Sequence, residues 1–329
     1  MKKYIIEPED ILFWIEGVVP IISELRNASL IGYPIYPKDA DLAIKRAKRR
    51  CIDYKIDKPL EIETIDHQAV CKLAENELNK GLLGKVLKDE EVEFRILLRT
   101  GFLSKVGVKF IISYDLFLIR NDMSESIYNI EESYEELLVD GLSYTSKEWK
   151  YINGELFYPS KGSIISTAER IDRMMGEILS YPSCCVNRFI ENKKNDLYPL
   201  EVMYGNQVST DEDLSLFLKD IITRGKDFLT DICKKNIPDS IYSTPYMGFY
   251  PCSINCRNAI KLGKKLKDFS RSFGLIYPYN FKCLIPSLWH YCIIYGNKKD
   301  KKVIKMKEFL SDRERLRKFA YRLYKEESK

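Results

Sequence analysis

Residues 149–169 read WKYINGELFYPSKGSIISTAE, and this stretch marks a change from strand to helix along the chain. Its first half places two short runs of strand-forming residues on either side of Asn153 and Gly154, a pair that tolerates the positive φ angles of a type I′ turn. We therefore predict a β-hairpin. Further along, Ser166 and Glu169 form a capping box, in which the two side chains satisfy exposed backbone N–H groups at a helix start. The sequence thus predicts an α+β fold whose β part comes first.

Two domains are expected, because 329 residues exceed what a single hydrophobic core usually organises. We place the boundary between residues 162 and 163, just after the predicted hairpin. Residues 1–162 are predicted to form a mixed α/β domain with hairpins. Residues 163–329 are predicted to form a mainly helical domain that carries a cysteine cluster and a basic C-terminal helix.

Hydrophobic periodicity predicts further elements on both sides of this boundary. Residues 108–119 are rich in β-branched and aromatic residues, so a strand or a hairpin is predicted there. The predicted helices span residues 39–54, 65–78, 166–179, 184–192, 211–235, 253–273, 287–295 and 301–327, with an interruption at Asp312 in the last one.

Composition and apolar run lengths bear on the compartment. The first seven residues hold too few apolar side chains for a signal peptide. The longest nearly uncharged apolar stretches, residues 11–22 and 283–295, are shorter than the roughly 18 apolar residues of a membrane-spanning helix. We therefore expect a cytoplasmic protein with no membrane partner. Only two glutamines accompany abundant Lys, Glu and Ile, a composition that favours a thermophilic source.

Positive charge is concentrated at the C-terminal end of the chain. The formal net charge is +5, yet residues 257–329 hold 20 Lys and Arg against 7 Asp and Glu. Such a region could bind RNA or another polyanion, with residues 257–267 and the last helix as the contact surface. The alternative is that these residues are the solvated faces of ordinary basic helices. The sequence leaves the oligomeric state open.

Two segments of the chain share a local design around cysteine. Residues 181–185 read YPSCC and residues 250–256 read YPCSINC, and each passes into a predicted helix. Proline ends the incoming chain, and serine can cap the helix. The thiols then lie near helix N-termini, where free N–H groups and the helix dipole stabilise a thiolate. The four residues singled out as candidate metal ligands are Cys184, Cys185, Cys252 and Cys256.

The spacing of these cysteines favours a metal site without identifying the metal. Cys252 and Cys256 are four residues apart, so in one helical turn they would face the same side. The overall spacing matches no zinc ribbon, so we place an iron–sulfur cluster ahead of zinc. Two alternatives stay open: the four side chains are buried packing residues, or Cys184 or Cys185 forms a disulfide with Cys252 or Cys256.

Three short motifs carry a resemblance to a known family. They are Tyr-Pro-Ser-Cys-Cys-Val at residues 181–186, Pro-Cys-Ser-x-x-Cys at residues 251–256, and Gly-Tyr-Pro at residues 32–34. With these motifs the chain resembles the archaeal domain-of-unknown-function family 483 over most of its length. The resemblance implies an archaeal cytoplasmic protein and brings with it no activity and no catalytic residue.

The two histidines of the chain are weaker candidates. His67 lies four residues before Cys71 on a predicted helix, a spacing that could make a ligand pair, and His290 lies in a segment rich in aromatic residues. An ordinary amphipathic helix and a hydrogen-bonded core histidine explain these positions better, and the roles of both histidines stay open.

Three functional hypotheses follow from the sequence. The first is a thiolate-ligated metal protein, with iron–sulfur ahead of zinc, in which the metal could serve an enzyme reaction on an unidentified substrate. The second is an RNA-binding protein whose cysteines are structural. The third is a thiol–disulfide redox protein. Whether the protein is an enzyme is left open.

Overall fold

The computed structural model describes residues 11–30, 60–62, 108–112, 116–120, 125–127, 129–130, 133, 150–152, 155–157, 163–194, 211–244, 249–294, 296 and 299–329. The chain divides into two compact units. The first, which we call the helical unit, contains Met1–Leu25, Tyr181–Asn192 and Leu197–Lys329. The second, the sheet unit, contains Arg26–Ser180 and Lys193–Asp196. The boundary between residues 162 and 163, as the limit of an independently folding domain, stays a prediction.

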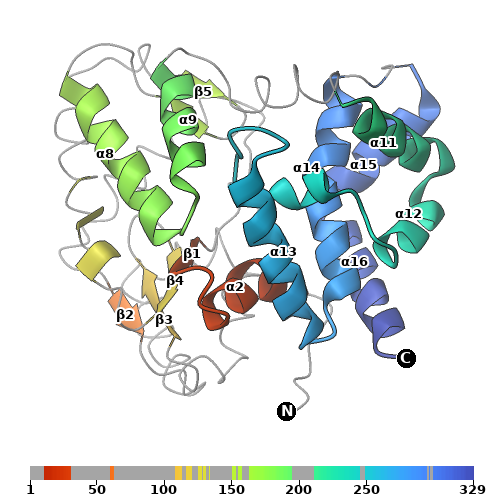
Figure 1. Cartoon of the computed structure of the whole chain (residues 1–329), viewed down its shortest axis with the longest axis horizontal. Helices are drawn as coiled ribbons and strands as arrows, with labels where there is room; N and C mark the ends of the chain where they lie inside the picture. Colours follow the sequence, from red (N-terminus) through yellow and green to blue (C-terminus); the bar gives the residue numbers. More distant parts are fainter. Residues whose placement is uncertain are drawn as a thin grey trace, which may run out of the picture. The chain divides into compact units, whose positions relative to one another are not determined.

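The helical unit is built from short N-terminal helices, the first ten residues of α9 and the helices of the last third of the chain (Figure 1). Its elements are α1 (Ile11–Phe13), the π-helical turn η1 (Trp14–Val18), α2 (Val19–Ile22), α9 (Ser183–Lys194), α11 (Glu212–Arg224), α12 (Lys226–Cys233), the 3₁₀ turn η4 (Asp239–Ser243), α13 (Arg257–Arg271), α14 (Ile276–Ile294), α15 (Lys301–Ser311) and α16 (Arg313–Glu327).

Helix α14 forms the centre of this unit. Its sequence is apolar nearly all round, as expected for a helix with neighbours on every side. It packs against α1, α11, α12, α13, α15 and α16. Its first two backbone N–H groups, at Ile276 and Tyr277, donate to the carboxylate of Glu327 at 3.0 and 2.7 Å, so the end of α16 caps the start of α14.

The N-terminal segment completes the core of the helical unit. Residues 11–22 bury nearly all their apolar side chains, and α1 packs against α14 and α16. Glu16 in η1 forms an ion pair with Lys282 of α14 at 3.3 Å, and the Lys282 side chain is fully buried. The ammonium group of Lys282 also donates to the carbonyl of Thr244 at 3.5 Å. Segments from opposite ends of the chain therefore share one core.

Among its described residues, the sheet unit contains two antiparallel sheets and the long helix α8. The larger sheet has the strand order β1-β4-β3-β2, and the smaller one pairs β5 with β6. Arg26, which is buried, donates from Nε to the carbonyl of Leu179 at 3.1 Å, which ties the segment before β1 to the end of the helix. The elements are β1 (Ala28–Leu30), β2 (Leu60–Ile62), β3 (Val108–Ile112), β4 (Leu116–Arg120), β5 (Lys150–Ile152), β6 (Glu155–Phe157) and α8 (Ser163–Ile178).

The two predicted β-elements are confirmed. Within residues 108–119, the predicted strand region, β3 and β4 pair antiparallel, with Ile112 opposite Leu116. The strands on either side of Asn153-Gly154 pair as β5 and β6, with Ile152 opposite Glu155. Helix predominates among the described residues, as predicted for the second half. The predicted helices at 39–54 and 65–78 lie outside the described residues.

Several helix boundaries differ from the prediction for identifiable reasons. Helix α8 begins at Ser163, so the capping box at Ser166 lies inside the helix and does not start it. The predicted helix 211–235 is two helices, because Gly225 adopts a φ of 81° and ends α11. Helix α14 begins at Ile276 and continues through Pro286, whereas the sequence predicted a start at residue 287. The predicted interruption at Asp312 is confirmed, since Asp312 lies between α15 and α16.

Among the described residues, no helix combines the length and the apolar character needed to span a membrane.

Candidate metal centre

Cys184 and Cys185 lie in the first turn of α9. Pro182 ends the incoming chain, and its carbonyl accepts hydrogen bonds from the N–H groups of Cys185 at 2.8 Å and Val186 at 3.1 Å. These bonds start the helix at Ser183, one residue before the position that the sequence predicted. Both thiols are therefore held at a helix N-terminus, as the YPSCC motif predicted.

Cys252 and Cys256 lie in a turn that leads into α13. The N–H of Cys256 donates to the carbonyl of Ser253 at 3.0 Å, which closes the turn. Cys256 is then the N-cap residue of α13, and its carbonyl accepts from Ile260 at 2.9 Å. The predicted helix start at Ser253 is wrong, because the chain first makes this turn and becomes helical only at Arg257. The turn, rather than one helical turn, brings the two cysteines together.

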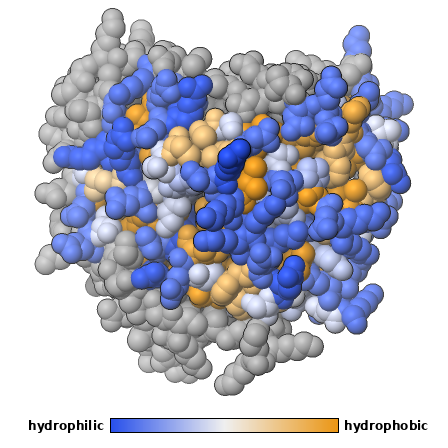
Figure 2. Space-filling view, viewed as in Figure 1, coloured by the Kyte–Doolittle hydropathy of each residue, from blue (hydrophilic) through white to orange (hydrophobic). Residues whose placement is uncertain are grey.

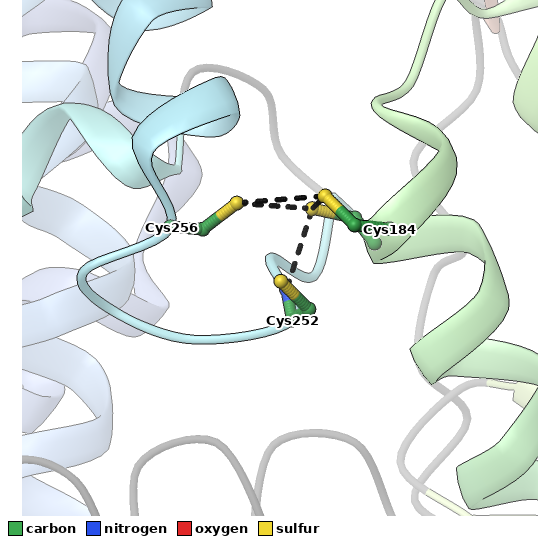
Figure 3. Close-up of side chains that lie close together, drawn as sticks. Cys184, Cys252 and Cys256 are labelled. Carbon is green, nitrogen blue, oxygen red and sulfur yellow. Dashed lines mark hydrogen bonds between the residues drawn. The ribbon is translucent and has the colours of Figure 1, made fainter.

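The four sulfur atoms converge on one point within the helical unit (Figure 3). The Sγ atoms of Cys184, Cys185 and Cys256 form a triangle with edges of 3.7, 3.8 and 3.9 Å. The sulfur of Cys252 completes the group, and all four sulfurs lie within 4.8 Å of one another. Such a group could hold a metal ion.

Backbone and amide N–H groups point at two of the sulfurs. The N–H of Cys252 donates to the Sγ of Cys185 at 3.4 Å, and the side-chain amide of Asn258, in the first turn of α13, donates to the Sγ of Cys184 at 3.6 Å. N–H donors of this kind favour the thiolate over the thiol. Asn258 was missed by the sequence reasoning, although its place two residues after Cys256 puts it at the helix N-terminus.

The protonation of the four thiols depends on burial and on their closeness. Burial is the main reason that the pKa of Cys185 is raised far above its usual range, and repulsion between neighbouring thiolates adds to it. Burial likewise raises the pKa of Cys252 to about 12. At Cys184 burial acts in the same direction, but hydrogen bonds from Asn258 and from the other thiols outweigh it and lower the pKa. A bound cation would favour all four thiolates, since it supplies the missing positive charge.

Two aromatic pairs join the cysteine-bearing segments. The rings of Tyr181 and Phe249 lie 4.6 Å apart between centroids, and the rings of Phe189 and Tyr250 stack in parallel at 6.0 Å. Aromatic contacts at these distances are favourable beyond the apolar area they bury. The segments 181–189 and 249–256 are therefore held together by contacts that do not depend on a metal.

The other described cysteines lie apart from this group. Cys233, Cys283 and Cys292 are fully buried, and all seven described cysteines are free thiols. His290 is buried in α14 and is not a member of the four-sulfur group, so the ligand role considered for it is not supported. The other histidine, His67, lies outside the described residues, as do Cys51 and Cys71.

Part of the chain matches a known protein family. Residues 157–277 match the model of a family described as "Protein of unknown function (DUF483)". The predicted resemblance to family 483 is confirmed for these residues, whereas its extension over most of the chain and the archaeal source stay predictions. The matched DUF483 segment contains all four cysteines of the site, whereas the Gly-Tyr-Pro motif at residues 32–34 lies outside it. No curated protein and no solved structure matches the chain.

Proposed function

We propose that Cys184, Cys185, Cys252 and Cys256 bind a single metal ion as thiolates, and that this ion ties α9 to the start of α13. The observation that carries the proposal is the spacing of the sulfurs. Ligands placed about 2.3 Å from a tetrahedral ion lie about 3.8 Å from one another. The three sulfur–sulfur distances among Cys184, Cys185 and Cys256, at 3.9, 3.8 and 3.7 Å, agree with that edge length.

This spacing favours one ion over a cluster. In an iron–sulfur cluster the thiolates bind different iron atoms, so their sulfurs stand further apart than the ligands of one ion. Zinc, which takes four thiolates tetrahedrally in structural sites, fits the compact group best. Our proposal therefore places zinc ahead of an iron–sulfur cluster, the opposite of the order that the sequence suggested.

A closed coordination sphere argues for a structural role of the ion. Catalytic zinc sites keep one position open for water or substrate, whereas four protein ligands fill a tetrahedral ion. Here four thiolates from two segments supply the whole sphere. The ion would then stabilise the helical unit, and any reaction of the protein would take place elsewhere.

Metal and acid-labile sulfide analysis of anaerobically purified protein, together with its absorption spectrum, tests the proposal. We expect one zinc ion per chain, no labile sulfide and no visible absorption. Labile sulfide with charge-transfer bands would instead indicate an iron–sulfur cluster. Protein that binds no metal even after incubation with zinc under reducing conditions contradicts the proposal.

We also propose a second candidate function, the binding of RNA through α13. Arg257, Lys261 and Lys265 follow one another at intervals of four residues, so they form one stripe along the helix. All three are exposed, and in the part of the chain that the structure describes no salt bridge joins them to an acidic group. Hydrophilic residues cover much of the visible surface where α13 lies (Figure 2).

Other basic residues of α13 are already engaged within the helical unit. Lys264 forms an ion pair with Asp239, and the ammonium group of Lys267 lies 4.8 Å above the ring of Tyr242. On this helix, the RNA contact surface that we propose therefore consists of Arg257, Lys261 and Lys265.

A titration of labelled transfer RNA at low and moderate salt tests this candidate. Phosphate contacts release counterions, so genuine binding should weaken steeply as salt rises. Replacing Arg257, Lys261 and Lys265 by alanine should weaken binding more than replacing Lys301, Lys302 and Lys305, three exposed lysines of α15. If both sets of replacements weaken RNA binding equally, or if the protein binds no RNA at low salt, RNA binding through Arg257, Lys261 and Lys265 is contradicted.

A further inference from the structure

The four-sulfur group has one buried side and one accessible side. The side chains of Cys185 and Cys256 are 1% and 7% exposed, whereas Cys184 and Cys252 are only half-buried. Within the triangle of sulfurs at 3.7–3.9 Å, Cys184 is therefore the one that a small molecule in solution can reach first. Reaction of a thiolate with an oxidant follows exposure as well as thiolate character.

The geometry around Cys184 selects one partner for a disulfide. Cys185 lies 3.9 Å away, sulfur to sulfur, but it is the next residue, and consecutive Cα atoms about 3.8 Å apart are closer than disulfides usually allow. Cys256 lies 3.8 Å away on a separate segment, in the turn that starts α13. To form an S–S bond of about 2.0 Å, these two sulfurs need to approach each other by about 1.8 Å.

We propose that a hydroperoxide releases the bound metal by converting Cys184 and Cys256 into a disulfide, so that the site responds to peroxide. This inference rests on the metal site proposed above. It gives that site a regulatory property, in which oxidation decides whether the ion stays bound.

The chemistry balances in two steps. The Cys184 thiolate attacks one oxygen of the peroxide, an S–O bond forms while the O–O bond breaks, and the other oxygen leaves as water or an alcohol after taking a proton. The Cys256 thiolate then attacks the sulfenic sulfur of Cys184, the S–S bond forms, and the hydroxyl leaves as water after taking a second proton. Two thiolates thus supply the two electrons that reduce the peroxide.

Loss of two thiolates accounts for the release of the ion. A disulfide sulfur carries no negative charge, so only Cys185 and Cys252 would remain as ligands. The disulfide would join the same two segments that the ion had joined. Oxidation would therefore exchange one link between α9 and α13 for another, and a thiol reductant with zinc would restore the first.

The test uses the full chain loaded with zinc under reducing conditions and then freed of reductant. The zinc content of this starting protein is measured first, and it alone decides the metal proposal. Hydrogen peroxide is then added in small excess, released zinc is followed with a chromophoric chelator, and free and oxidised cysteines are labelled with light and heavy alkylating reagents for mass spectrometry. We expect release of one zinc per chain together with a Cys184–Cys256 disulfide, both reversed by dithiothreitol and zinc.

Internal controls come from the same chain. Cys233, Cys283 and Cys292 are fully buried, so their oxidation should be at least tenfold lower than that of Cys184. A Cys184→Ser variant should leave Cys256 unoxidised under the same exposure, whether or not the variant keeps its metal. Three outcomes would each overturn the proposal. The protein could retain its zinc, it could release zinc while Cys184 is only over-oxidised, or it could form a disulfide between other residues. If the protein takes up no zinc, the same labelling of metal-free protein still tests the disulfide.

Discussion

Cys256 and Cys233 are both buried cysteines, but their surroundings differ. Cys256 lies within 3.8 Å of two other sulfurs, whereas Cys233 is fully enclosed in the core at the end of α12. Replacing Cys256 by serine should lower metal affinity by at least about 100-fold. Even mutations of residues that only hydrogen-bond to a metal ligand lower metal affinity by roughly 10–100-fold. Metal content after dialysis measures the effect.

Cys233→Ser is the matched control, because it makes the same chemical change away from the four-sulfur group. This variant should keep the metal content of the wild type and lose only stability, since it buries a hydroxyl group. Equal metal retention by both variants would mean that the four cysteines are packing residues.

His290 is a residue whose burial makes stability depend on pH. Burial lowers its pKa to about 4, while an unfolded chain protonates histidine near pH 6.5. Above pH 6.5 both states are neutral and the full stability is present. As the pH falls from 6.5 toward 4, the unfolded state alone takes up the proton, so stability is lost.

Between pH 7 and pH 5 this proton uptake should cost about 2 kcal/mol. Replacing His290 by glutamine removes the titration, so the variant should lose about 2 kcal/mol less than the wild type over that range. Urea unfolding of both proteins at the two pH values gives the difference. Parallel losses in the two proteins would show that His290 is not protonated on unfolding.

The candidate site could be predicted from sequence only as far as local pattern reaches. Two similar segments with proline shortly before cysteine were enough to select four residues out of nine cysteines. The amide of Asn258 and the stacking of Phe189 on Tyr250 could not be foreseen, because each depends on how segments far apart in sequence pack. The sulfur spacing, which separates one ion from a cluster, is likewise a property of the fold.

At the scale of elements, the packing of α13 on η4 fixes where the four-sulfur group can form. A Cβ atom at Gly263 would lie 2.0 Å from the carbonyl oxygen of Tyr242, so the two backbones touch at this glycine. The carbonyl of Gly263 also accepts a hydrogen bond from Tyr279 at 2.8 Å. Helix α13, and with it Cys256, is positioned by this close approach.

Replacing Gly263 by alanine should therefore destabilise the protein. In an exposed helix, replacing glycine by alanine raises the free energy of unfolding by about 1 kcal/mol. Here the clash with Tyr242 should outweigh this gain and lower the free energy of unfolding by about 2 kcal/mol in total. Chemical unfolding measures the change. Lys261→Ala, at an exposed position of the same helix, should stay within about 0.5 kcal/mol of the wild type. A Gly263→Ala protein as stable as this control would refute the close approach.

The helix boundaries that the sequence missed share a physical cause. The predicted helix at residues 211–235 includes Gly225, but Gly225 has a positive φ and ends α11. The predicted helix at residues 287–295 begins just after Pro286, yet α14 runs through this proline because several surrounding helices pack against the apolar segment. Local periodicity reports which residues prefer helix, and tertiary contacts decide where each helix ends.

At the scale of the whole helical unit, the Glu16–Lys282 pair joins the N-terminal segment to the central helix. Breaking a buried pair leaves one charge without this partner, so Glu16→Gln should cost about 3–5 kcal/mol. The double variant Glu16→Leu with Lys282→Met should lose much less stability than the sum of the losses from Glu16→Leu alone and Lys282→Met alone. A double-mutant cycle from urea unfolding measures the coupling.

The exposed pair of Glu314 and Lys318 on α16 offers a matched control. Both side chains are more than 70% exposed, so water screens the pair and the effects of changing Glu314 and Lys318 should be close to additive. Additive effects at Glu16 and Lys282 would show that the buried pair is not coupled in the folded protein.

Because segments from both ends of the chain share one core, the parts of this core become available at different times during synthesis. The apolar segment at residues 11–22 packs against α14 and α16, which are made roughly 250 residues later. At about 5–20 residues per second, this segment must wait roughly 12–50 seconds for its partners. During that interval Trp14 and its apolar neighbours stay exposed on the nascent chain, where they can be bound by a chaperone. The helical unit can therefore close only after α14 and α16 have left the ribosome.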